Sequence, residues 1–463
     1  SGTFDIFRQA SNTSTINLSG NFSMTSGTLT KYGNGIGNFN FAKSGTQTYT
    51  KSGGTISNAV NFTVNNGSTL DLGTNLIEGS SGTFTLSSGG GLITANTAGI
   101  TSTGATGSIQ VVGTRTYNTG ANYTFNGSSA QVTGNGLTGA ANLTINNSSG
   151  VTLTSNTSLS GTLTLTNGIL TVGSTNTITV SSGGSITATS GSLASGTGAG
   201  TFTFSGTGTI SGTIGFNHVN IAGGVNFGTA STINGTLSIN AGGFVSTNAP
   251  IYASGSTLKY NSGGTYGRGT EWSAASAAGY PHHVQISTGT ILDLGANSGT
   301  ATARQIAGNM TVDNGTTLSM SLNPMTAPLT VKGNYFNYGI TILSSSSGGD
   351  LVLEGNLTDN ATFTANGRAI FFQGSNPQTI NSSDNPLDID VARFNKTGGE
   401  VILSQNLLID ETADPVQFAG TSILNLNGFA ATFGKSNTAS IITMNSTSAI
   451  KGSANSHLTI YGN

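Results

Sequence analysis

The chain has 463 residues, of which 6% are charged, and its 14 basic and 16 acidic residues give a formal net charge of −2. This near-neutrality gives no electrostatic reason to expect nucleic acid or an anionic membrane as a partner. Disorder is also excluded, because disordered chains combine low hydrophobicity with high net charge. No apolar run approaches the roughly 18 residues of a membrane helix, so we expect no membrane insertion.

Apolar residues alternate with Ser, Thr or Asn in short bursts, which is the pattern of half-buried strands. In chain order these bursts include residues 62–64, 70–72, 84–86, 143–145, 163–165 and 202–204. Asn-Gly pairs accept positive φ at little cost and therefore predict sharp corners between strands. They lie at residues 66–67, 126–127, 167–168, 234–235, 314–315 and 366–367. We find no amphipathic helix, and the sequence predicts an all-β protein.

One repeat consists of two short strands followed by Gly and a third strand. In the copies that begin at Phe62, Leu143, Val219 and Val284, the strand after Gly comes 22, 20, 18 and 26 residues after the first. This spacing suits one turn of a three-sided coil whose corner loops absorb the variation in length. The sequence therefore predicts a right-handed parallel β-helix, or solenoid, of about 20 turns.

A second motif, Phe-x-Gly-x-x-x-Gln, implies a larger duplicated unit of several turns. It spans Phe125 to Gln131 and Phe372 to Gln378, and a looser version runs from Phe41 to Gln47. Each Gln is followed 12 to 16 residues later by a predicted strand. A β-propeller is disfavoured, because no regular period of about 40 to 50 residues with blade signatures is present.

We expect one continuous β-helix over residues 1–463, near-neutral over 1–259, with an aromatic excursion over 260–283 and an acidic C-terminal part within 284–463. From Thr116 to Leu258 the sequence has no Asp, Glu, Lys or Arg. We interpret this stretch as a neutral stalk; the alternative is a flat hydroxyl surface that binds sugar, another rod or ice. Thr162-Leu-Thr164-Leu-Thr166 favours ice binding only weakly, because the spacing of threonines drifts between turns.

Ten of the 16 carboxylates fall between Asp350 and Asp414. Asp388-Ile-Asp390 places two of them on one face of a strand, which suits an acid/base pair for polysaccharide cleavage or a calcium site. We favour a solvated charged strand, because dedicated calcium loops and the signatures of zinc proteases and hydrolases are missing. The sequence thus predicts no catalytic residues, no metal site and no cofactor.

The excursion interrupts the repeat, which resumes at Val284. It gathers the only Trp with aromatic, charged and imidazole groups, which is the composition of a sugar-binding platform or a protein contact. The candidate ligand- or partner-binding residues are Tyr266, Arg268, Glu271, Trp272, Tyr280, His282 and His283. The alternative is that Trp272 and the tyrosines plug a corner of the coil.

The amino-acid sequences of the repeats resemble those of β-strand-repeat surface proteins of the Bacteroidota. The resemblance rests on residues 91–100, 124–131, 141–147, 161–168 and 267–272, and it covers nearly the whole chain. It implies a large protein that is exported by the type IX secretion system and acts as an adhesin or cell-surface fibre. Such proteins usually end in a C-terminal sorting domain, and its absence here leads us to expect a fragment of a larger protein.

We therefore expect a non-enzymatic, extracellular structural or adhesive protein at the cell surface. Its expected partners are further copies of itself, other surface or fibre subunits, or glycans. The alternative is a β-helical protein that binds or degrades polysaccharide, and it requires Asp388, Asp390 and Arg393 to line a cleft.

Overall fold

The computed structural model describes residues 2–6, 12–194, 198–411, 414–435 and 442–461. Over these residues the chain is all-β, with strands β1 to β57 and one short 3-10 helix. Parallel sheets stack as a β-solenoid of about 19 turns. This confirms the predicted fold class.

The chain divides into two compact units, Ser1–Thr232 and Ile233–Asn463, which are described separately. In unit 1 the longest stack holds β3 (Phe22–Met24), β6 (Gly45–Lys51), β9 (Ser68–Asp71), β12 (Gly91–Thr94), β15 (Asn122–Phe125), β18 (Asn142–Asn146), β21 (Thr162–Asn167), β24 (Gly184–Ala188), β27 (Gly208–Ser211) and β29 (Gly224–Asn226). Two stacks of five strands hold β2 (Thr13–Leu18), β5 (Ile36–Phe41), β8 (Val60–Val64), β11 (Phe84–Leu86) and β14 (Arg115–Tyr117), and β17 (Gly139–Ala140), β20 (Thr157–Leu159), β23 (Thr177–Val180), β26 (Thr201–Phe204) and β28 (Gly215–Ile221). The shorter stacks hold β1 (Thr3–Asp5), β4 (Thr28–Thr30) and β7 (Thr55–Ile56); β10 (Ile77–Gly79) and β13 (Ile109–Val111); and β16 (Gln131–Val132), β19 (Val151–Thr152), β22 (Ile169–Thr171) and β25 (Ser192–Leu193).

In unit 2 the longest stack holds β30 (Thr232–Asn240), β33 (Thr257–Asn261), β35 (His283–Ile286), β38 (Met310–Val312), β41 (Tyr335–Asn337), β44 (Leu357–Asp359), β47 (Gln378–Ser382), β50 (Val401–Leu403), β53 (Ile423–Asn425) and β56 (Ala449–Lys451), with β32 (Ile251–Tyr252) beside β30. The others hold β34 (Thr265–Gly267), β36 (Ile291–Asp293), β39 (Thr317–Ser319), β42 (Ile340–Ile342) and β45 (Thr362–Thr364); β37 (Arg304–Ile306), β40 (Leu329–Val331), β43 (Leu351–Leu353), β46 (Ala369–Gly374), β49 (Val391–Lys396), β52 (Val416–Gly420) and β55 (Ile442–Met444); and β48 (Leu387–Ile389), β51 (Leu407–Ile409), β54 (Ala430–Phe433) and β57 (His457–Ile460). Unit 2 also contains β31 (Phe244–Val245) and the 3-10 helix η1 (Thr270–Trp272).

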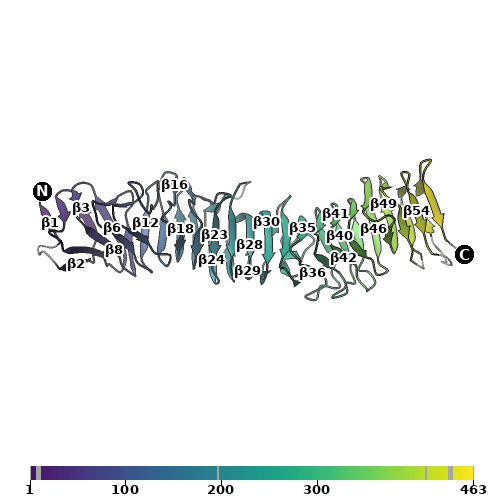
Figure 1. The fold of residues 1–463 in the computed structure, drawn as a ribbon, viewed down its shortest axis with the longest axis horizontal. Helices are drawn as coiled ribbons and strands as arrows, with labels where there is room; N and C mark the ends of the chain where they lie inside the picture. Colours follow the sequence, from purple (N-terminus) through teal and green to yellow (C-terminus); the bar gives the residue numbers. More distant parts are fainter. Residues whose placement is uncertain (1, 7–11, 195–197, 412–413, 436–441, 462–463) are drawn as a thin grey trace. The chain divides into compact units, whose positions relative to one another are not determined.

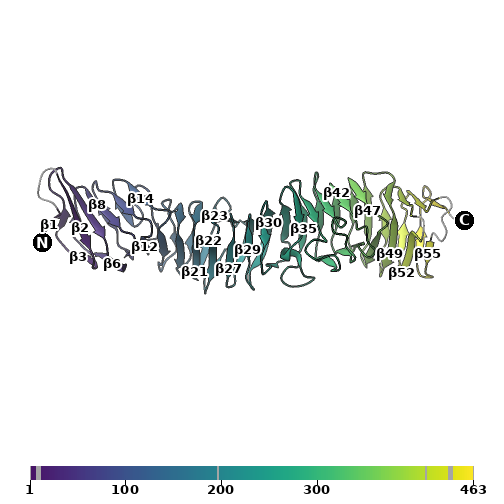
Figure 2. The same cartoon turned by 90° about the horizontal axis from the view of Figure 1, so that it is seen from below.

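Within each unit, strands of successive turns lie side by side (Figures 1 and 2). They pair in parallel, so apolar residues line up in columns. Phe39 pairs with Phe62, and Phe62 pairs with Phe84; all three side chains are buried. Each buried side chain of this size contributes about 1.5–3 kcal/mol relative to exposure. The predicted spacing is confirmed where Leu143 pairs with Leu163 and where Val284 pairs with Met310.

Most of the predicted Asn-Gly corners are turns in which glycine has a positive φ. Gly67, Gly168, Gly315 and Gly367 have φ between +69° and +78°. The prediction is wrong at Asn234-Gly235, because both residues lie inside β30. Strand pairing along the stack overrides the local turn preference there.

The Phe-x-Gly-x-x-x-Gln motif ties one corner to the preceding turn. Gln131 donates from Nε2 to the carbonyls of Thr94 and Asn96, while Gln378 donates to those of Leu353 and Gly355. Both Gln side chains are buried. The glutamine therefore adds side-chain hydrogen bonds between a corner and the backbone of the preceding turn.

Candidate functional site

The segment over residues 260–283 lies in unit 2, between strands that keep the repeat. β33 pairs with β35 at a spacing of 26 residues, which equals the spacing between β35 and β38, so the segment occupies one turn of the coil. Within this excursion β34 pairs with β36, and η1 follows. The part of the predicted excursion without strand structure is the loop over residues 268–282, which contains η1, while β34 keeps the strand pairing.

Trp272 is fully buried in the described structure, which favours a plug over an exposed platform at this residue. Its indole Nε1 donates to the carbonyl of Gln305 at 3.0 Å. A flat indole face offered to a sugar ring would require exposure, so Trp272 does not form that face.

Glu271 is also fully buried and holds the excursion from inside. Its Oε1 accepts hydrogen bonds from the Gly269 N–H at 2.7 Å and from the Tyr260 hydroxyl at 3.1 Å. The Tyr252 hydroxyl donates to the Glu271 backbone carbonyl at 3.0 Å. Burial raises the pKa of the Glu271 carboxyl, and the hydrogen bonds from Gly269 and Tyr260 oppose that rise.

Tyr266 lies partly exposed beside this carboxyl. Burial and the neighbouring charge of Glu271 raise the pKa of the Tyr266 phenol. Tyr266 Oη and Glu271 Oε2 are both buried, yet neither makes a hydrogen bond of good geometry. The effect of the Glu271 charge on the Tyr266 phenol shows that the two groups lie near each other.

Arg268 is 4% exposed and clamps the backbone of the excursion. Its guanidinium donates four hydrogen bonds to backbone carbonyls, which belong to Leu294, Ala296, Gly269 and Trp272. These contacts use the donors that would otherwise bind a carboxylate or a sugar hydroxyl. Arg268 therefore positions η1 and the loop after β36.

Arg304 is a second buried cation in the cluster that the sequence analysis missed. Burial, followed by the charge of Arg268, lowers the pKa of the Arg304 guanidinium to about 10. A Cβ on Gly299 would lie 2.2 Å from Nη2 of Arg268 and 2.7 Å from Nη2 of Arg304. Glycine at this position therefore leaves room for both guanidinium groups.

The other candidate residues are Tyr280, His282 and His283, and they do not line the pocket over this cluster. The rings of His282 and His283 pack edge to face with centroids 4.4 Å apart. His282 Nε2 lies 3.3 Å from the Ser254 hydroxyl, and His283 Nδ1 accepts from the Asn309 N–H at 2.9 Å. Burial and the neighbouring His282 lower the pKa of His283. Tyr280 is half-buried.

An open pocket of about 450 Å³ lies over the buried cluster. It is lined by Phe244, Tyr266, Thr270, Ser273 and Asn297, among others. Phe244 is 49% exposed and was not among the sequence candidates. The pocket thus combines aromatic rings with hydroxyl and amide groups, and Tyr266 and Arg268 are its predicted members.

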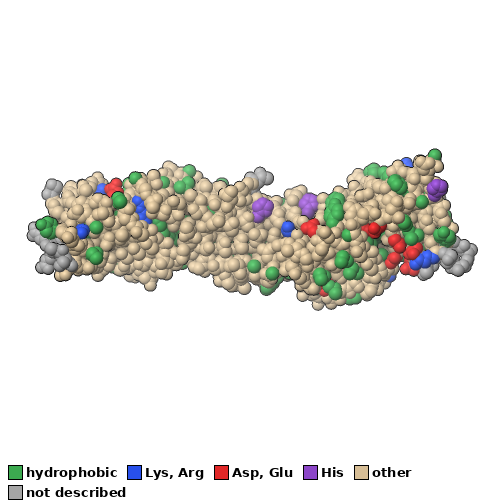
Figure 3. All heavy atoms as spheres, viewed as in Figure 1, with side chains coloured by type: hydrophobic (Ala, Val, Ile, Leu, Met, Phe, Trp, Pro, Cys, Tyr) green, Lys and Arg blue, Asp and Glu red, His purple; other side chains and the backbone are tan. Residues whose placement is uncertain are grey.

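Asp388 and Asp390 lie near each other in the acidic part of unit 2, but their surroundings differ. Asp388 is exposed on β48, whereas Asp390 accepts from the Gly367 N–H at 2.5 Å. Burial, followed by the charges of Asp410 and Asp390, raises the pKa of Asp388. Arg393 lies 3.9 Å from Asp414. Figure 3 shows acidic and basic atoms side by side near this end of unit 2.

Among the described residues, no three His, Asp or Glu side chains are grouped to hold a metal ion. In the same part of the chain no helix has the length and apolar character to cross a membrane. The fold defines the chain as a parallel β-solenoid. Comparisons with family models, curated proteins and solved structures found no match.

Proposed function

We propose that this chain is a non-enzymatic structural or adhesive protein that lies outside the cell, as part of a surface layer or fibre. One observation carries the proposal. Arg268, Glu271 and Trp272, the groups of the excursion most suited to chemistry or binding, are buried and make contacts inside the solenoid. A catalytic site needs such groups within reach of a substrate. The sequence resemblance to surface proteins of the Bacteroidota supports export by the type IX system.

An in-register column of hydroxyl groups in unit 1 supports an adhesive surface. Thr124 pairs with Thr144, Thr144 with Thr164, and Thr164 with Thr187. The spacing of these threonines in the sequence differs from turn to turn, but the corner loops take up the difference in length. The column of threonines therefore stays in register over these turns. A neutral, partly exposed hydroxyl column suits an uncharged partner such as a glycan chain.

The pocket beside Phe244 is the most specific place for such a contact. An exposed aromatic ring offers an apolar face to a sugar ring, and Thr270, Ser273 and Asn297 offer donors and acceptors around it. In this proposal Phe244 and Tyr266 contact the glycan, while Glu271 and Trp272 hold the pocket floor.

Binding of purified protein to a glycan array and to cells tests the adhesive role. We expect Phe244→Ala to weaken binding without changing thermal stability. Val112→Ala is the control, because Val112 is 74% exposed on unit 1 and is not among the residues that line the pocket. Failure of the wild-type protein to bind any glycan or cell surface would contradict the adhesive role.

A second candidate function is polysaccharide cleavage, favoured by the raised pKa of Asp388 beside two other carboxylates. It predicts turnover of a polysaccharide that disappears in both Asp388→Asn and Asp390→Asn. The hydrogen bond that Asp390 accepts from the Gly367 N–H argues against polysaccharide cleavage, because this carboxylate already holds the backbone of a neighbouring turn.

A further inference from the structure

Three arginine side chains are buried in the described part of the chain, namely Arg115, Arg268 and Arg304. The guanidinium of Arg115 donates to three backbone carbonyls of unit 1, and that of Arg268 donates to four backbone carbonyls of unit 2. Arg304 differs, because its Nε is buried with no hydrogen-bond partner among the described residues. Buried polar groups are nearly always hydrogen-bonded, so this exception indicates that an acceptor is missing beside Arg304.

Arg268 and Arg304 also lie close together with no acidic side chain paired to either of them. A Cβ at Gly299 would lie 2.2 Å from Nη2 of Arg268 and 2.7 Å from Nη2 of Arg304. The two Nη2 atoms are therefore within about 5 Å of each other, a distance at which like charges repel. No ion pair between described residues includes either arginine. Glu271 acts on the pKa of Arg304 only after burial, Arg268 and Tyr260, so it compensates little of this positive charge.

Arg268 connects these two cations to the open pocket of unit 2, because its side chain lines that pocket. Its four hydrogen bonds use four of the five guanidinium N–H donors and leave one donor on Nη2. This is the nitrogen that lies beside Arg304. The rings of Phe244 and Tyr266 and the amide of Asn297 also line the pocket. One hollow thus combines aromatic rings, neutral polar groups and a cationic edge.

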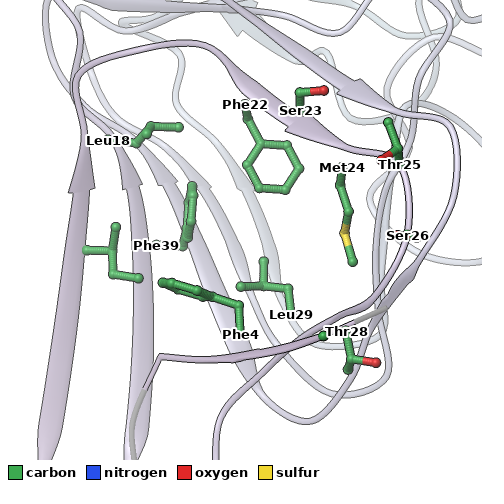
Figure 4. Close-up of a pocket in the computed structure, with 12 residues that line it drawn as sticks. Phe4, Leu18, Phe22, Ser23, Met24, Thr25, Ser26, Thr28, Leu29 and Phe39 are labelled. Carbon is green, nitrogen blue, oxygen red and sulfur yellow. The ribbon is translucent and has the colours of Figure 1, made fainter.

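Two other pockets lack this combination. Figure 4 shows Phe22, Met24 and Phe39 around a pocket of unit 1, and no charged residue is among those that line it. A second pocket of unit 1 is lined by Lys51, but no aromatic residue lines it and Lys51 is paired with Glu78 at 2.9 Å. The pocket of unit 2 is therefore the one of these three that offers an aromatic ring together with an uncompensated cation.

We propose that the pocket of unit 2 binds an acidic glycan through a sugar carboxylate held by Arg268 and Arg304, with a sugar ring against Phe244. A carboxylate supplies the negative charge and the acceptor oxygens that the two guanidinium groups lack. It meets Nη2 of Arg268 at the pocket wall and Arg304 behind that wall, since Arg304 is not itself in the lining. This inference rests on the proposed adhesive function and deepens it, because it names the class of glycan.

Calorimetric titration with two matched pairs of ligands tests the proposal: oligogalacturonate against its methyl ester, and sialyllactose against lactose. The wild-type protein is expected to bind the acidic member of at least one pair about tenfold more tightly than the neutral member. Arg304→Met should bind both members equally, and Phe244→Ala should weaken both. Lys332→Met is the matched control and should keep the preference, because Lys332 is exposed, does not line the pocket and loses the same charge.

Equal binding of both members of each pair by the wild type would overturn this inference and leave the adhesive role standing. An acid preference that survives in Arg304→Met would overturn it as well. So would acetate or sulfate that binds as tightly as the glycans, which shows a site for small anions only, and so would polyglutamate that binds more tightly than either acidic glycan. If Arg304→Met fails to fold, the comparison of acidic and neutral ligands on the wild type still decides the proposal. Absence of binding to every glycan and to cells would instead refute the adhesive role itself.

Discussion

Replacing Trp272 with alanine tests whether the indole is a structural plug. The side chain is fully buried, and Trp-to-Ala changes at such positions cost about 3–5 kcal/mol of unfolding free energy. The substitution also leaves the Gln305 carbonyl without its donor, a loss of about 1 kcal/mol that lies within this range. We expect Trp272→Ala to destabilise the surrounding turns by about 4 kcal/mol.

The assay must be local, because each turn of a solenoid contacts only its neighbours. Hydrogen exchange resolves the opening of β33, β35 and β38, which flank the excursion. A loss of about 4 kcal/mol corresponds to about thousandfold faster exchange for amides that exchange through opening of these turns. Amides of unit 1 should keep their wild-type rates.

Two control variants separate volume from hydrogen bonding. Trp272→Phe keeps most of the ring volume but loses the N–H donor, and we expect it to cost about 1–2 kcal/mol. Phe244→Ala removes a half-exposed ring above the same cluster and should cost less than about 1 kcal/mol. If Trp272→Ala costs no more than Phe244→Ala yet abolishes glycan binding, the plug interpretation is refuted.

Three further variants probe buried ionisable groups through urea unfolding at several pH values. The raised pKa of Glu271 means that the wild-type protein loses stability as pH rises through that pKa. Glu271→Gln should remove this loss, so its stability relative to the wild type should be higher at pH 8 than at pH 5. Burial raises the pKa of Asp359 to about 6, so the wild type should lose up to about 3 kcal/mol between pH 4 and pH 7, and Asp359→Asn should flatten that slope. Burial lowers the pKa of Lys396 to about 8, so the stability of the wild type should rise between about pH 8 and pH 10.5, and Lys396→Met should abolish that rise. If any of these three variants keeps the pH slope of the wild type, the shifted pKa assigned to the replaced residue is wrong.

Period-two alternation and strand spacing were sufficient to predict the solenoid, because both follow from backbone geometry. The distance from Phe62 to Phe84 equals one turn, and the two residues pair as expected. Local turn chemistry was less reliable, as Asn234-Gly235 shows, because pairing with adjacent turns decides the backbone path there. An Asn-Gly pair therefore forms a corner only where the backbone is not paired as a strand with adjacent turns.

The candidate site was predicted as a segment, and its internal geometry was not. The unusual composition of residues 260–283 identified the excursion, yet it could not reveal that Trp272 is buried. Arg304 and Gln305 lie about one turn later in sequence, and their contacts with the excursion depend on how the corner loops fold. Phe244 was missed because a lone exposed Phe carries no sequence signal.

Buried polar side chains in this protein serve mainly to hold corners. Gln131 accepts from Asn147 Nδ2 at 2.8 Å, and Gln378 accepts from Lys396 Nζ at the same distance, so an asparagine in one motif copy and a lysine in the other donate to the glutamine. Lys396 also donates to the carbonyls of Gln373 and Asn376, and it is fully buried. A charge placed there gains hydrogen bonds but pays desolvation, which explains its lowered pKa. Because even this lysine is committed to the backbone, the chemistry of this corner stabilises the solenoid.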